Sequence, residues 1–433
     1  MTGRLHGCLL CVILCAVCSG QETDNNMWSK LAEDTKVTLQ VLNYATTNGV
    51  VSNSWFNPGN HLANIAAGDA TVEIRPDLRF TRGILTVIVK PRVAAGTSLT
   101  LDVPAARATP VDAYMQEWSV RANVRQDLML SYGREVLQWG PSMTVSPSNP
   151  FFLDNGRANP IKEIGGRDFF RAVYTPSSRY SVSYLANTGL GRGDTPIGPF
   201  RRIQALKVDY TSKSFNFSIN ASDTAGSRPA YGGYFQWTVS DAVLVYAESS
   251  VHTGTGALYP SSAQNGSGWQ MSPPVDAHYH PTSVLGSAYT LRGGSTLNVE
   301  YISNRLGYSD SQAREYYQMA QAASSGLASG APGATADATL LGAALNPGLL
   351  LLRRNYVSLQ FLRANFHNRA DLMARYTMNL DDGGGTLTGY ATLNWTNRLQ
   401  LFAVGMLNDG GKRTESGRLL RDQVSVGIRV FAK

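Results

Sequence analysis

Polar and apolar residues alternate with a period of two along many segments of this chain. Within residues 113–124, Trp118 and Val120 fall on one side of the alternation. Glu117 and Arg121 fall on the other side. Because successive side chains of a β-strand point to opposite faces, this period predicts strands with one apolar face and one charged face.

The alternation, with the turn residues that interrupt it, predicts an all-β chain of about eighteen strands, with a range of 16 to 20. Gly133 falls where the alternation changes phase, which predicts a β-bulge. The predicted strands cover residues 36–45, 70–81, 84–92, 112–124, 127–139, 167–175, 179–187, 202–211, 214–222, 231–240, 242–251, 283–292, 295–304, 354–363, 368–379, 385–395, 398–407 and 421–431.

The connections between these strands alternate in length. Short turns are typical of the periplasmic rim of an outer-membrane barrel and long loops of its outer rim, whereas a Greek-key sandwich has no reason to alternate in this way. An even number of strands also places both chain ends on the rim of the short turns. The longer connections are residues 46–69, 93–111, 140–166, 188–201, 223–230, 252–282, 305–353, 380–384 and 408–420.

Aromatic residues lie near several of the short turns. Tyr174 and Tyr180 flank one turn, and Tyr210 and Phe215 flank the next. Aromatic rings at the two membrane–water interfaces are typical of transmembrane barrels. A soluble secreted all-β protein with an apolar interior is the alternative, and dependence on detergent distinguishes the two.

The first twenty residues resemble a secretory signal peptide. Arg4 and His6 precede an apolar run at residues 8–18, and the small residues Ser19 and Gly20 follow. Cleavage there assigns residues 21–433 to the barrel. All four cysteines lie within the apolar run, so the mature chain would carry no thiol, disulfide or Cys-based metal site.

Composition narrows the function further. The formal net charge of +7 is spread along the chain without a Lys/Arg run, which argues against a nucleic-acid partner. No later window holds 18 consecutive apolar residues, so membrane insertion would require a closed barrel. No GxSxG, P-loop or HExxH motif occurs, and we predict neither an enzyme nor a cofactor.

The chain resembles the porin-like barrels of the Gram-negative outer membrane, including the alginate-export-type channels. The resemblance is carried by residues 72–76 (VEIRP), by residues 132–140 (YGREVLQWG) and by residues 147–150 (PSNP). It implies one transmembrane barrel in the cell outer membrane, in contact with lipid and lipopolysaccharide. It also implies the passage of small hydrophilic solutes.

A barrel of this strand number is wide enough to hold water, so the residues on the charged side of the strands are the predicted pore lining. Their basic excess predicts a mild preference for anionic solutes. The predicted pore-lining residues are Glu73, Arg75, Arg79, Glu117, Arg121, Lys207, Asp209, Glu300, Asp371 and Arg375.

The third long loop, residues 140–166, is the candidate constriction. Prolines stiffen it, and its charged residues Asp154, Arg157, Lys162 and Glu163 could line a narrow point. A loop that merely covers the outer mouth is the alternative. The long loop 305–353 should carry a short helix at residues 312–323 and a flexible stretch at residues 326–338.

Three further expectations remain. Asp276, His278 and His280 share one face of an extended segment and form a weak candidate metal site. A barrel that surrounds or docks a partner, such as polymer-export machinery or an electron-transfer cytochrome, is the alternative function. A protein partner or a second copy of the chain stays open.

Overall fold

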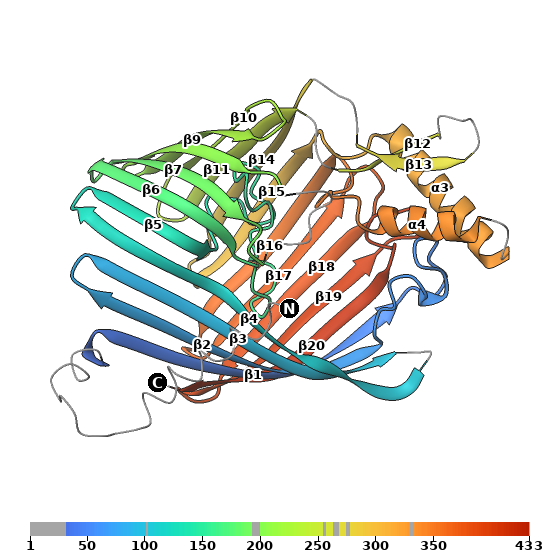
Figure 1. The fold of residues 1–433 in the computed structure, drawn as a ribbon, viewed down its shortest axis with the longest axis horizontal. Coiled ribbons are helices and arrows are strands. Elements are labelled where there is room, and N and C mark those ends of the chain that lie inside the picture. Colours follow the sequence, from blue (N-terminus) through green and yellow to red (C-terminus); the bar gives the residue numbers. More distant parts are fainter. Residues whose placement is uncertain are drawn as a thin grey trace.

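The computed structural model describes residues 32–100, 103–192, 200–253, 257–262, 268–273, 278–329 and 333–432. Eighteen antiparallel strands form one sheet that closes on itself, because β1 (Thr35–Val50) pairs with both β2 (Gly68–Arg82) and β20 (Leu420–Ala432) (Figure 1). The predicted closed barrel is confirmed.

Every predicted strand corresponds to one strand of the barrel, often with longer ends. The strand predicted at 127–139 is instead shorter and ends at Glu135, where the chain turns into the long connection to the next strand. The remaining strands are β3 (Leu85–Thr100), β4 (Val103–Arg125), β5 (Leu128–Glu135), β6 (Arg167–Ser177), β7 (Tyr180–Gly189), β8 (Ile203–Thr211), β9 (Phe215–Thr224), β10 (Ala230–Thr238), β11 (Val243–Thr253), β14 (Tyr279–Thr290), β15 (Ser295–Asn304), β16 (Asn355–Phe366), β17 (Ala370–Asn379), β18 (Gly385–Asn394) and β19 (Leu399–Asp409).

Two predictions for residues 93–133 are wrong. Residues 93–111 are mostly strand rather than loop, since β3 and β4 continue pairing far beyond the other hairpins. Their many small residues hide the contrast between faces, yet backbone pairing does not depend on it. Gly133 lies in regular register opposite Ser119 rather than in a bulge. It has φ +142°, and a Cβ there would lie 2.1 Å from the Trp118 carbonyl oxygen.

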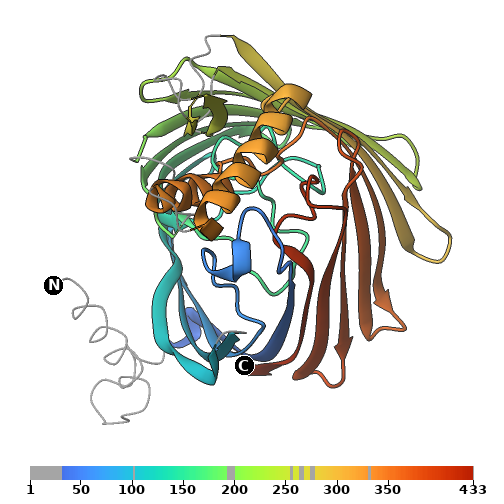
Figure 2. The same cartoon turned by 90° about the vertical axis from the view of Figure 1, so that its right-hand side faces the viewer.

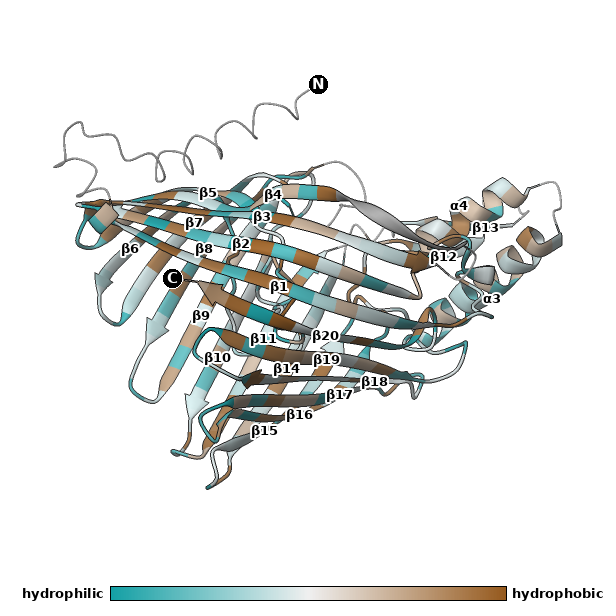
Figure 3. Cartoon of the chain, turned by 90° about the horizontal axis from the view of Figure 1, so that it is seen from below, coloured by the Kyte–Doolittle hydropathy of each residue, from teal (hydrophilic) through white to brown (hydrophobic). Residues whose placement is uncertain are grey.

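The outer face of the barrel is apolar and its inner face is polar, as a lipid environment requires. Leu206, Ile219 and Val426 point outward and are 52, 56 and 53 % exposed. Glu73 and Glu300 point inward and are 5 and 1 % exposed. Apolar and hydrophilic residues alternate along many of the strands (Figure 3). A soluble barrel would bury the apolar side, so this arrangement matches transmembrane barrels.

Two helices and a small hairpin lie at one end of the barrel (Figure 2). They are α3 (Asp310–Ser329), α4 (Ala334–Leu345), and the hairpin of β12 (Tyr259–Ser262) and β13 (Trp269–Ser272). The predicted helix at 312–323 is therefore longer. The flexible stretch predicted at 326–338 is wrong where the structure describes it, because its alanines continue one helix and start the next.

A capping box opens α3. The Ser309 hydroxyl accepts a hydrogen bond from the Gln312 amide N–H, and the Gln312 side chain accepts one from Ser309 N–H. Phe56 and Tyr308 pack against Tyr316 of α3 as part of a buried apolar cluster. Phe56 precedes a short 3₁₀ helix, η1 (Pro58–Asn60). No helix in the described part of the chain is long and apolar enough to span a membrane.

Candidate functional site

The connection between β5 and β6, residues 136–166, folds into the barrel (Figure 2). We call it the inner loop. Side chains on the inner face of at least nine strands hold it by hydrogen bonds, ion pairs and apolar contacts. The position in which these contacts hold the inner loop therefore determines how much of the lumen remains open.

Glu300 of β15 provides the first anchor. Its carboxylate accepts hydrogen bonds from the Ser142 hydroxyl at 3.1 Å, the Met143 amide at 2.5 Å, and the Thr144 amide and hydroxyl at 3.0 and 2.6 Å. The Tyr246 hydroxyl of β11 donates a fifth bond at 2.8 Å. Amide and hydroxyl donors thus surround a fully buried carboxylate.

Glu248 of β11 provides the second anchor. Its carboxylate accepts bonds from the hydroxyls of Ser146 and Ser148, both at 2.7 Å, and from the Ser142 amide at 3.3 Å. Gly140 passes close to this carboxylate with φ +86°, and a Cβ there would lie 2.2 Å from it. Only glycine combines this left-handed conformation with such a close approach.

An arginine cluster on β2 and β3 holds the far end of the inner loop. Arg92 donates two hydrogen bonds to Glu163, at 2.7 and 2.8 Å, and also lies 2.9 Å from Asp77. Arg75 donates to the Ile161 carbonyl at 2.8 Å and to Glu73 at 2.7 Å. Planar guanidinium groups suit such paired contacts.

Apolar contacts accompany each polar anchor. Phe151 packs edge-on against Phe169 of β6, with ring centroids 4.9 Å apart. Ile161 packs among Leu42 and Phe402, on β1 and β19. A third group joins Val145 to Val284, Ile302 and Tyr356. These apolar residues of the inner face are thus covered by the inner loop.

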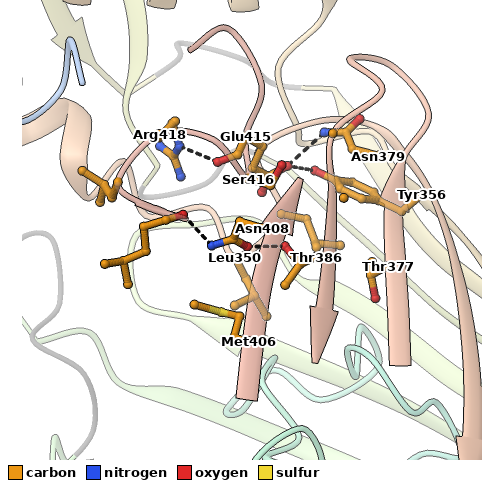
Figure 4. A pocket seen from close by; sticks show the side chains of 15 residues that line it. Leu350, Tyr356, Thr377, Asn379, Thr386, Met406, Asn408, Glu415, Ser416 and Arg418 are labelled. Atoms are coloured by element: carbon orange, nitrogen blue, oxygen red, sulfur yellow. Dashed lines mark hydrogen bonds between the residues drawn. The ribbon is translucent and has the colours of Figure 1, made fainter. Parts of the chain in front are cut away.

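The inner loop leaves space along one wall. A cavity of about 200 Å³ separates it from β18–β20 and is lined by Asp154, Lys162, Thr388, Met406, Gln423 and Ser425, among others. A second cavity, of about 330 Å³, lies toward the outer rim (Figure 4). Met406 lines both cavities. Both cavities thus lie against the same sector of the wall.

Comparison with known proteins supports this fold. No family model and no curated sequence matches the chain. Among solved structures, OccAB3 of Acinetobacter baumannii has a TM-score of 0.51 at 11 % identity, over 92 % of this chain and 99 % of its own. OprD of Pseudomonas aeruginosa has a TM-score of 0.51 at 10 % identity, over 92 % and 95 %. Both are Gram-negative outer-membrane porins.

The chain has the fold of an outer-membrane porin. Within this porin fold, most of the predicted pore-lining residues lie on the inner face as pairs. Arg121 lies 3.2 Å from Glu135, Glu117 accepts a bond from Lys90 at 2.7 Å, and Lys207 pairs with Asp209. These contacts neutralise much of the charge that the sequence displays.

The other predicted residues have different surroundings. Arg375 donates to the Gln360 side chain at 2.6 and 2.8 Å, and Asp371 accepts from Thr392 at 3.1 Å. Arg79 is an exposed residue of β2. Their role in lining a pore stays a prediction.

The four predicted residues of the inner loop also separate. Asp154 and Lys162 line the cavity against β18–β20, and Glu163 is held by Arg92. Arg157 donates to the carbonyls of Pro141, at 3.1 Å, and Ser142, at 2.7 Å, within the loop itself. Arg157 therefore stabilises the loop conformation.

Sequence reasoning missed the anchors Glu248 and Arg92. The faces of the strand containing Glu248 were indistinct, and Arg92 stood at the end of a strand predicted too short. An isolated charged residue on an otherwise small or apolar segment was the available signal.

The weak candidate metal site is only partly described. Asp276 lies outside the described residues, whereas His280 belongs to β14 and lies opposite His252 in register. Among described residues, no group of three His, Cys, Asp or Glu side chains could hold a metal ion.

Proposed function

We propose that this chain is an outer-membrane porin-like channel for the passive passage of small hydrophilic solutes. The observation that carries the proposal is the space between the inner loop and β18–β20, which Asp154, Lys162 and Gln423 help to line, inside a closed barrel with an apolar outer face. Barrels of 16 to 18 strands leave an aqueous lumen of this kind. The inner loop forms the constriction.

We further propose a mild preference for anions. Arg375 and Arg429 bond to the neutral side chains of Gln360 and Gln400 rather than to carboxylates. Amide and hydroxyl groups of the inner loop enclose the carboxylates of Glu248 and Glu300. The wall therefore keeps cationic charge while two of its carboxylates are covered, which favours anionic solutes.

Liposome swelling tests the channel. Proteoliposomes should swell fast with a pentose and progressively slower with hexoses and disaccharides, because the space beside the inner loop is narrow. Equal, slow swelling for all sugars, as in protein-free liposomes, would argue against a channel. The reversal potential in a KCl gradient tests selectivity, and a sign that reports K⁺ preference contradicts the anion proposal.

The inner loop crosses the lumen, which disfavours the alternative of a barrel that surrounds a partner. No observation on the described residues favours this alternative. Membrane fractionation tests the location: the mature chain should sediment with the outer membrane and require detergent for extraction.

A further inference from the structure

The cavity at the outer rim differs in chemistry from the constriction below it. We call it the outer cavity. Strands β16–β20, the loop 410–419 and the loop 346–354 contribute residues to its wall (Figure 4). Its apolar lining residues are Leu350, Leu351, Leu419, Leu420 and Met406. Its polar lining residues, which we call the polar side, are Thr377, Asn379, Thr386, Asn408, Glu415 and Ser416, with Tyr356 and Arg418 nearby.

Hydrogen bonds within the protein hold the side chains of the polar side in place and occupy several of their donor groups. The Thr386 hydroxyl donates to Asn408 Oδ1, and Asn408 Nδ2 donates to the Leu420 carbonyl, both at 2.8 Å. The Ser416 hydroxyl donates to the Asp409 carbonyl. Each hydroxyl and amide oxygen keeps a lone pair, so this side offers chiefly acceptors to a ligand.

The charged groups of the outer cavity have protein partners. The Glu415 carboxylate accepts from the Tyr356 hydroxyl at 2.5 Å, from Asn379 at 3.1 Å and from the Leu352 amide at 2.9 Å. Arg418 donates to the Tyr316 hydroxyl at 2.6 Å and to the Glu415 carbonyl at 3.1 Å. With one carboxylate and one guanidinium both bonded internally, the cavity has no strong preference for either sign of charge.

We propose that the outer cavity is a solute-binding site for compact uncharged molecules that carry hydroxyl groups on an apolar body. The apolar body would lie against the leucines, and the hydroxyls would donate to the acceptor side. Because Met406 lines both cavities, a bound solute would lie directly before the constriction. This proposal rests on the proposed channel function and names a class of solute for it.

Current block by two uncharged glucosides tests the site. Phenyl β-D-glucoside and methyl β-D-glucoside share the sugar hydroxyls and differ in the apolar part. Phenyl β-D-glucoside should reduce the ion current of reconstituted wild-type protein at a concentration about tenfold lower than methyl β-D-glucoside, because its ring buries apolar area. Equal potency of the two glucosides overturns the proposal.

A matched pair of leucine variants locates the block. Leu350 lines the outer cavity and is 46 % exposed, whereas Leu380 does not line it and is 47 % exposed. Leu350→Asn should raise the half-blocking concentration of phenyl β-D-glucoside about three- to tenfold, and Leu380→Asn should leave it unchanged. Equal effects of the two variants overturn the binding site but leave the channel intact. A wild-type protein that carries no current overturns both.

Discussion

Replacing Glu300 with glutamine removes the charge from the most enclosed anchor of the inner loop while conserving its shape. The carboxylate is 1 % exposed and accepts five hydrogen bonds, four of them from residues 142–144. A glutamine amide has one oxygen and one NH₂ group. Hydroxyl donors can rotate to accept from NH₂, but the amides of Met143 and Thr144 cannot. At least one backbone N–H therefore loses its acceptor.

The cost follows from two terms. A buried donor without an acceptor costs about 1–3 kcal/mol, and the remaining bonds lose their charge assistance. Together we expect a loss of about 3 kcal/mol in the free energy of docking the inner loop. Since 1.4 kcal/mol corresponds to about a tenfold change in an equilibrium, the undocked fraction should rise about 100-fold.

Hydrogen exchange of the purified protein in detergent micelles measures this change directly. The protection of amides in residues 140–148 should fall about 100-fold in Glu300→Gln, because exchange there reports local opening. Glu117→Gln is the matched control, since Glu117 faces inward but pairs with Lys90 rather than with the loop. Unchanged protection in Glu300→Gln would refute the anchoring role.

Four further predictions concern the inner loop and the wall opposite it. Arg92→Met should increase current noise, because it removes two charge-assisted bonds to Glu163; unchanged noise counts against the cluster. Burial raises the pKa of Glu163, but bonding to Arg92 outweighs it and holds the pKa below its ordinary value. The ionised Glu163 carboxylate therefore stabilises the docked inner loop at every pH above the pKa that Glu163 has in the undocked loop. Current noise of the wild-type protein should rise only as the pH falls below about 4. Met406→Trp should lower single-channel conductance, whereas the outward Met378→Trp should not. Phe151→Ala should leave a cavity that lowers the free energy of unfolding by about 3–5 kcal/mol, and calorimetry should show a lower melting temperature.

The sequence predicted the strand order and both faces because a period of two is a local signal. Where residues 93–100 are mostly small, that contrast vanishes although the strand continues, and the prediction failed there. Side-chain partners followed a different rule. Glu248 and Arg92 gain their roles from segments about 100 and 70 residues away, and no local period encodes such contacts.

The candidate site was predicted in part. The loop 140–166 was identified by its length and place, and the structure brings Glu163 onto Arg92 and Lys162 into the open space. The ion pairs between inward-facing side chains could not be predicted from the sequence, so the predicted lumen carried more unpaired charge than the structure has. Arg121, for example, faces Glu135 across the β4–β5 pair.

Single-channel recording from the purified mature chain in a planar lipid bilayer tests the central claim most directly. A water-filled barrel narrowed by its own loop should give discrete current steps whose size scales with the salt concentration. At low voltage, the steps should have the same size at positive and negative potentials. Protein that inserts as a heat-modifiable folded barrel but carries no current would contradict the account.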